Sequence, residues 1–446
     1  MREHLANLVS GIADYISYPV GMLLVAPIIL HKLGAAEYGL WMISTAIISA
    51  GGIIASGFCD AATQRIARLR AATSTDCIVH AVRSMMSINI VLGSALAVTV
   101  WIAAPAAAPH IAVSGLIATT ECLHSIRIAA VLILVRGIES VGVCAHRAFE
   151  QYRRTVQISA AMRLLTLGAA AILVLCGRRT PAILVATGAF LILGAFLQLR
   201  ALRSSLGPVS LWPTSHLVES KTLLRHGIFL WLQTVSSVVF GQLDRILLGL
   251  SLGALAAAPY SLCLQFAQPI FGLSASALHF LFPYLSRRAT TLPRAKLRIF
   301  VVKAVLCNLL MVVSGTAIML LFGDRLIRVW AGPAVAFSAQ QILPPIVIGS
   351  ALLGLSVTGT YAMQALGLFK TVALISIGAR SCMLLLMIYL LHHMGLRGVV
   401  VARLFYGLTA LLVYIPLFRA LALGSKQSSF VPSRTIPGEL QQEPQL

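Results

Sequence analysis

The sequence predicts an all-α polytopic membrane protein of about twelve transmembrane helices, built as two six-helix lobes related by a parallel pseudo-repeat around a V-shaped central cavity. Hydrophobic residues make up 59% of the chain and charged residues only 11%, against about 25% charged in soluble proteins. The apolar residues form blocks of roughly 20, the length that crosses a bilayer as a helix. Backbone polar groups in lipid must pair within the protein, so these blocks are expected to be helical.

Each apolar block is expected to be one membrane span. The twelve predicted spans are 12–31, 38–58, 86–105, 122–145, 157–176, 181–200, 226–250, 255–282, 300–323, 340–363, 371–391 and 397–418.

The loops between the spans predict the orientation. With a cytoplasmic N-terminus, 21 Lys and Arg residues lie on the cytoplasmic side and six on the other. Cytoplasmic loops of membrane proteins are enriched in Lys and Arg, so both termini are predicted to be cytoplasmic. This bias also accounts for most of the formal net charge of +21 without any nucleic-acid partner. The expected location is a bacterial inner membrane.

Two halves and a tail are predicted. Residues 1–200 form an N-terminal six-helix lobe, 201–225 a cytoplasmic linker, 226–419 a C-terminal six-helix lobe, and 420–446 a disordered cytoplasmic tail rich in Ser, Gln and Pro. The pairs Leu33-Gly34 and Leu252-Gly253 each join the first two spans of a half. An even number of spans per half makes the repeat parallel, a design suited to alternating access between lobes.

The chain shows no pattern typical of an enzyme or a cofactor protein. It has no Walker loop and no large soluble segment for a transferase site. Its eight cysteines have no metal-ligand or redox spacing. We therefore expect no catalytic residue, metal or cofactor.

Charged residues at membrane depth are the strongest functional signal. Each costs about 2.5–3.5 kcal/mol at a span centre and usually faces a cavity or a partner. Seven of the ten are basic, so a cavity that they line is cationic and suits an anionic headgroup held by arginines. The ten are Asp14, Arg127, Arg136, Glu139, Arg163, Asp244, Arg245, Lys303, Arg380 and Arg403.

The predicted headgroup-binding residues are Arg163, Arg245, Arg380 and Arg136. Arg136 has an alternative role, because Glu139 lies three residues away on the same helical face and favours a structural ion pair. For Asp14, Asp244 and Glu139, ion coupling and a structural role both stay open. Lys303 and Arg403 lie close enough to span ends to reach the interface, and this is their expected role.

Three short segments resemble one family. Residues 33–41 read LGAAEYGLW, 242–249 read QLDRILLG and 282–286 read FPYLS. They are similar to motifs at the second, seventh and eighth spans of Wzx-type lipid-linked oligosaccharide flippases, within the multidrug/oligosaccharidyl-lipid/polysaccharide exporter superfamily.

This resemblance implies a function. The substrate would be an undecaprenyl-diphosphate oligosaccharide, moved to the periplasmic leaflet for O-antigen, capsule, exopolysaccharide or lipopolysaccharide biosynthesis. Membrane lipids, a polysaccharide polymerase and a chain-length regulator are the partners that it implies.

Other functions remain as alternatives. A multidrug extruder of cationic compounds would need acidic residues in the cavity, and a polymerase or ligase would need a large periplasmic loop. A peptidoglycan-precursor flippase differs less, although that branch commonly has more spans.

Overall fold

The computed structural model describes residues 2–59, 62–63, 65–66, 69, 75–149, 152–207, 210–214, 217–278, 281–288 and 293–422. For residues 2–20 and some other helical positions it describes only the course of the helix. The described secondary structure is entirely helical, which confirms the predicted fold class.

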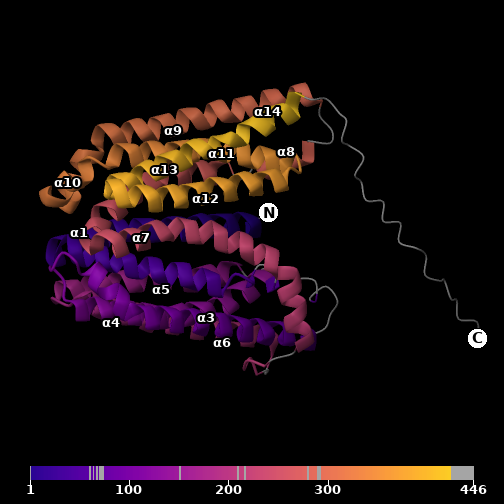
Figure 1. Ribbon diagram of the computed structural model, residues 1–446. Coiled ribbons are helices and arrows are strands. Elements are labelled where there is room, and N and C mark those ends of the chain that lie inside the picture. The colour runs from indigo at the N-terminus through magenta and orange to yellow at the C-terminus, as the bar shows by residue number, and fades with distance from the viewer. Residues whose placement is uncertain are drawn as a thin grey trace, which may run out of the picture.

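The helices follow one another along the chain with short connections (Figure 1). They are α1 (Arg2–Ala55), α3 (Thr75–Ile111), α4 (Thr119–Ala148), α5 (Tyr152–Leu175), α6 (Thr180–Leu206), α7 (Leu217–Ala277), α8 (Leu281–Arg288), α9 (Arg294–Ala331), α10 (Pro333–Gln340), α11 (Leu343–Ala365), α12 (Phe369–Met394), α13 (Leu396–Ala410), a 3₁₀ turn (Leu411–Val413) and α14 (Tyr414–Ala422).

The two longest helices are each broken at a glycine. Gly34 in α1 has φ 88° and ψ 173°, and Gly253 in α7 has φ 83° and ψ 174°. Side chains rarely tolerate positive φ, so glycine lets the chain reverse here between two helical arms. Within the described residues, ten helices are long and apolar enough to cross a membrane. Because α1 and α7 each supply two arms, these helices correspond to the twelve predicted spans.

The last predicted span, 397–418, is made of three pieces. It comprises α13, the 3₁₀ turn at Leu411–Val413 and α14. The predicted linker is shorter than expected as a non-helical segment, because α6 continues to Leu206 and α7 begins at Leu217. The division into two lobes at this linker stays a prediction. The predicted disordered tail lies, from residue 423 onwards, outside the described residues.

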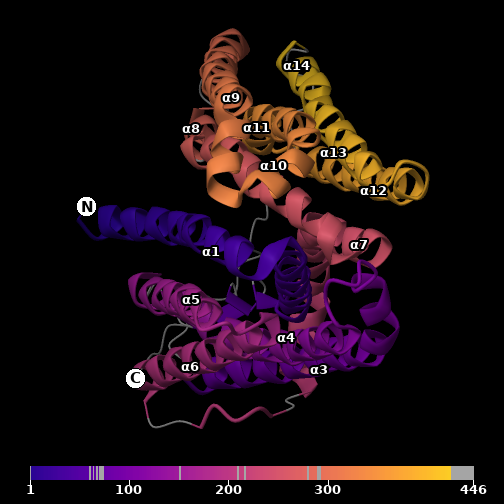
Figure 2. The ribbon, with the colours of Figure 1, turned by 90° about the vertical axis from the view of Figure 1, so that its left-hand side faces the viewer.

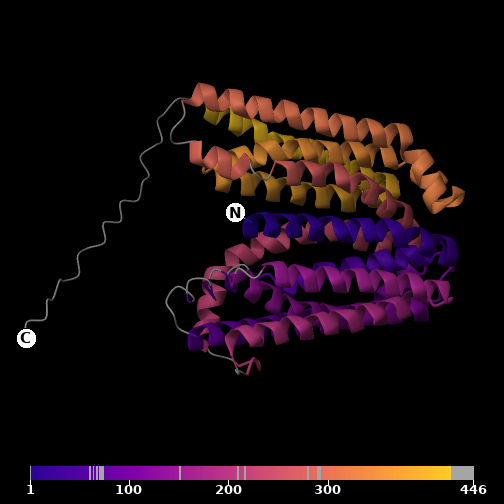
Figure 3. The same cartoon turned by 180° about the vertical axis from the view of Figure 1, so that it is seen from behind.

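The helices gather into two groups (Figure 2). One group holds α1 and α3–α6, the other holds α8–α14, and α7 extends along both. The view from behind shows the same arrangement (Figure 3). The V-shaped cavity predicted between the two groups stays a prediction.

The two groups touch at the end that carries the glycine kinks. A Cβ atom placed on Gly39 would lie 1.8 Å from the carbonyl oxygen of Ala254, so the two backbones are in direct contact. Nearby, the indole of Trp330 on α9 donates a hydrogen bond to the carbonyl of Leu23 on α1 at 2.8 Å. Under the predicted orientation, this closed end faces away from the cytoplasm.

A pair of buried asparagines supports the internal repeat. The Asn89 side-chain amide on α3 donates to the carbonyl of Gly137 and the hydroxyl of Ser140 on α4, at 3.0 and 3.1 Å. In the other half, Asn308 on α9 donates to the carbonyl of Gly354 and to a threonine hydroxyl on α11, both at 2.9 Å. Asn89 and Asn308 are 219 positions apart, as are Gly34 and Gly253. The halves therefore share helix contacts as well as helix order.

Candidate functional site

A cavity of about 230 Å³ lies among α1, α4 and α5, and is called the N cavity here. Its lining combines small and hydroxyl residues with charged ones. Three arginines and one glutamate line it: Arg136, Glu139, Arg147 and Arg163. The structure thus brings together two of the predicted headgroup residues, Arg136 and Arg163, which lie on different helices.

An ion pair forms inside the N cavity. Arg136 Nη1 lies 2.5 Å from Glu139 Oε2, so the ion pair weighed for these residues is present. Glu139 is 5% exposed and Arg136 37% exposed. The stem of Arg136 packs against Gly52 of α1, where an added Cβ would lie 2.5 Å from Arg136 Cγ. Glycine at this position leaves room for the arginine between the helices.

Buried amide groups fix the rest of the N cavity. Gln198 on α6 donates to the hydroxyl of Ser159 at 3.3 Å and accepts from the hydroxyl of Thr155 at 3.0 Å. These contacts hold α5 in a fixed rotation against α6. Because Arg163 lies one helical turn after Ser159, the same rotation directs both residues toward the N cavity.

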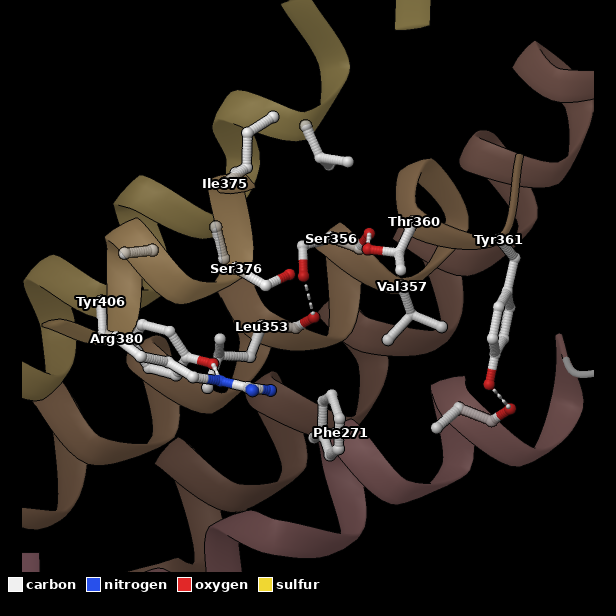
Figure 4. Close-up of a pocket in the computed structure, with 14 residues that line it drawn as sticks. Phe271, Leu353, Ser356, Val357, Thr360, Tyr361, Ile375, Ser376, Arg380 and Tyr406 are labelled. Atoms are coloured by element: carbon white, nitrogen blue, oxygen red, sulfur yellow. Dashed lines mark hydrogen bonds between the residues drawn. The ribbon is translucent and has the colours of Figure 1, made fainter. Parts of the chain in front are cut away.

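A second cavity, of about 190 Å³, lies among α7, α11, α12 and α13, and is called the C cavity here (Figure 4). Most of its wall is apolar. Its polar and aromatic lining residues are Phe271, Ser356, Thr360, Tyr361, Ser376, Arg380 and Tyr406. Arg380, a third predicted headgroup residue, therefore lies in a different cavity from Arg136 and Arg163.

The polar groups of the C cavity are oriented by their neighbours. Arg380 Nε donates to the Tyr406 hydroxyl at 3.1 Å, and its guanidinium extends into the cavity toward the Phe271 ring (Figure 4). The Ser356 hydroxyl donates to the Leu353 carbonyl at 2.7 Å, and the Tyr361 hydroxyl to the Ala275 carbonyl at 3.2 Å. These two oxygens consequently offer lone pairs, and the remaining guanidinium N–H groups offer donors.

A buried ionic cluster links three membrane spans elsewhere in the second half. Arg403 Nη1 on α13 lies 2.5 Å from Asp244 Oδ2, and Asp244 is 1% exposed. The Tyr260 hydroxyl donates to the same carboxylate oxygen at 2.6 Å. The expectation that Arg403 reaches the interface is therefore wrong. A buried carboxylate in reach of its guanidinium binds it more strongly than water at a distant span end.

The remaining predicted residues lie apart from both cavities. Arg245 follows Asp244 on α7, lines neither cavity, and has a buried Nε without a hydrogen bond to any described residue. Asp14 lies on α1, and its side chain is outside the described part of the structure. Among the described residues, no three of His, Cys, Asp and Glu lie close enough together to hold a metal ion.

Sequence reasoning missed a repeated hexapeptide. Residues 158–163 read ISAAMR and residues 375–380 read ISIGAR, so both follow the pattern I-S-x-x-x-R. Its serine and arginine line the N cavity in the first half and the C cavity in the second. Aligning the two halves at their glycine kinks would have revealed the signal.

Residues 7–288, more than half of the chain, match the protein family described as "Polysaccharide biosynthesis protein". None of the curated proteins compared with the chain matches it.

Solved structures share the fold. The lipid II flippase MurJ in an inward closed conformation matches with a TM-score of 0.74 at 14% identity, covering 93% of this chain and 87% of that chain. A multidrug resistance MATE family transporter of the MOP superfamily, inward-facing, matches with a TM-score of 0.72 at 15% identity, covering 92% and 98%. A MOP superfamily transporter from Pyrococcus furiosus matches with a TM-score of 0.54 at 14% identity, covering 92% and 95%.

Proposed function

This chain belongs to the polysaccharide biosynthesis protein family, and we propose that it is a flippase for lipid-linked oligosaccharides. It moves undecaprenyl-diphosphate oligosaccharide units from the cytoplasmic to the periplasmic leaflet of a bacterial inner membrane by alternating access. The units feed O-antigen, capsule or exopolysaccharide biosynthesis, together with a polymerase and a chain-length regulator. Its N- and C-termini are cytoplasmic, as the loop charges predict.

The observation that carries this proposal is the charge of the N cavity. Three arginines against one glutamate leave a net charge of +2 on its lining. Charge at membrane depth is costly and is usually retained for a ligand or a pathway. A diphosphate diester is a dianion, and guanidinium groups bind its oxygens through paired hydrogen bonds. Arg136 and Arg163 would hold the diphosphate, while the polyprenyl tail stays in the lipid.

The same charge disfavours a multidrug extruder of cationic compounds, because a cationic lining repels a cationic drug. A peptidoglycan-precursor flippase stays as a second candidate. Its substrate has the same diphosphate, and the structural match to MurJ supports the shared fold. The two functions differ in the polymer that fails when the chain is lost.

The test is the fate of lipid-linked repeat units in cells that lack this chain. We expect these units to accumulate on the cytoplasmic face and surface polysaccharide to disappear. The wild-type chain should restore both, and Arg163→Ala, Arg245→Ala and Arg380→Ala should restore them poorly. Arg325→Ala, at an exposed position of α9, is the matched control and should complement fully.

Normal arrival of lipid-linked units in the periplasm of such cells would refute the proposal. Loss of peptidoglycan synthesis with intact surface polysaccharide would instead support the peptidoglycan-precursor function.

A further inference from the structure

The N and C cavities occupy equivalent places in the two halves. Arg163 and Arg380 are 217 positions apart, and so are their neighbours Ser159 and Ser376. The lining residues of α4 and α11 are related by the same spacing, and those of α1 and α7 by 219 positions, the spacing of the two glycine kinks. The internal repeat has therefore placed one cavity in each half.

Only part of the lining is the same in both cavities. Ser159 and Arg163 recur as Ser376 and Arg380, which keeps a hydroxyl and a guanidinium one helical turn apart. The other equivalent positions differ. In order from the N to the C cavity they change from Gly52 to Phe271, Ser56 to Ala275, Arg136 to Leu353, Glu139 to Ser356, Ser140 to Val357, Val143 to Thr360 and Cys144 to Tyr361.

These differences change the chemistry in a consistent direction. The C cavity has lost the Arg136–Glu139 pair and gained two aromatic rings, Phe271 and Tyr361. Its described lining carries a net charge of +1, from Arg380 alone, against +2 in the N cavity. A single guanidinium matches a monoanion better than it matches the dianionic diphosphate.

The hydroxyl groups of the C cavity are set to accept hydrogen bonds. Ser356 and Tyr361 donate their protons to backbone carbonyls, so their oxygens are acceptors toward the cavity. Acceptor oxygens suit a ligand that bears hydroxyl donors and repel the oxygens of a phosphate. The C–H faces of a sugar ring also fit the electron-rich faces of aromatic rings. Hydroxyl acceptors, aromatic rings and one guanidinium together describe a site for an acidic sugar.

We propose that the C cavity binds one acidic sugar of the transported glycan, with the sugar carboxylate on Arg380 and the sugar ring against Phe271 and Tyr361. This inference rests on the proposed flippase function and specifies its substrate class as a carboxylate-bearing glycan. The volume of about 190 Å³ lies below the roughly 300–1,000 Å³ of pockets for drug-sized ligands. The C cavity therefore accommodates a single ring, and the rest of the glycan lies outside it.

The test compares two lipid-linked disaccharides that differ at one carbon. Both carry undecaprenyl diphosphate, and the terminal sugar is glucuronic acid in one and glucose in the other. Binding to the purified full chain in lipid nanodiscs is measured for wild type, Arg380→Gln and Arg163→Gln. We expect Arg380→Gln to weaken binding of the glucuronyl lipid by about tenfold to a hundredfold, the usual contribution of a charge-assisted hydrogen bond. Its binding of the glucosyl lipid should stay unchanged, which also shows that the variant is folded.

Arg163→Gln should weaken binding of both lipids equally, because both carry the diphosphate. Equal weakening of both lipids by Arg380→Gln, or weakening of neither, would overturn the acidic-sugar site. An Arg163→Gln chain that binds both lipids normally would instead count against the proposed headgroup site, whatever Arg380→Gln does.

A second variant tests the aromatic part of the site without removing charge. Phe271→Leu should weaken binding of both disaccharide lipids relative to undecaprenyl diphosphate without sugar. If its affinity falls equally for all three lipids, or for none, the ring does not contact a sugar and the proposed site is wrong.

Discussion

Arg403 and Asp244 come together across 159 residues of sequence. Their contact, with Tyr260 on the same carboxylate, joins the two arms of α7 to α13. A buried carboxylate that loses its guanidinium keeps a charge without compensation, which costs more than removing both partners. The cluster is thus a packing constraint on the second half, and Asp244 is engaged in it.

Substitution of one partner tests this reading. We expect Arg403→Met to lower the unfolding free energy by about 3–5 kcal/mol, the usual cost of breaking a buried ion pair. The double variant Asp244→Asn/Arg403→Met should recover much of this loss because it leaves no buried charge. Thermal unfolding of the purified chain in detergent measures both. A double variant as unstable as Arg403→Met would show that packing, and not charge, explains the loss.

At the scale of the helices, close backbone contact decides where the two groups meet. Gly39 on the second arm of α1 touches the backbone of Ala254 on the second arm of α7. Both residues lie just beyond a glycine kink, so each kink delivers its second arm to the contact. A side chain at position 39 would force the arms apart at this end of the molecule.

We expect Gly39→Ala to favour the open form of this end and to slow transport. In a chain without native cysteines, Ala254→Cys is fully buried in the closed form and should react slowly with a membrane-impermeant maleimide. Gly39→Ala should accelerate this labelling several-fold. Gly168→Ala on α5, where an added Cβ meets no atom within 4 Å, is the control and should leave the rate unchanged. An unaltered rate in Gly39→Ala would show that the contact does not hold this end closed.

For the whole molecule, the arrangement of charges bears on what drives transport. Two of the three acidic residues predicted at depth, Glu139 and Asp244, are paired with arginines. An inside-negative potential favours outward movement of an anion by about 2.3 kcal/mol per charge per 100 mV. We propose that this potential drives an anionic headgroup outward without an obligatory counter-ion.

Vesicles that contain the purified chain test this directly. An inside-negative potassium-diffusion potential should shift an anionic lipid-linked saccharide to the outer leaflet, by up to about fiftyfold per charge at 100 mV. Asp14→Asn should behave like wild type, because no proton site is needed. Transport that requires a proton gradient and is lost in Asp14→Asn, while binding of the saccharide lipid survives, would establish proton coupling instead.

The sequence by itself determined the class of molecule, the spans and the two glycine kinks. Hydropathy determines these features because the bilayer admits only long apolar helices whose backbone groups pair internally. It also identified the arginines at membrane depth, since charge in an apolar block is conspicuous in one dimension.

Only the tertiary structure decided which of these charges meet. Arg136 and Arg163 share one cavity, Arg380 lines its counterpart in the other half, and Arg403 binds Asp244. Whether an arginine faces a cavity, a partner or lipid depends on the rotation of its helix and on which helices are neighbours. Contacts between distant segments set that rotation, as Gln198 does for Ser159, and the apolar pattern of a span that is hydrophobic all round does not encode it.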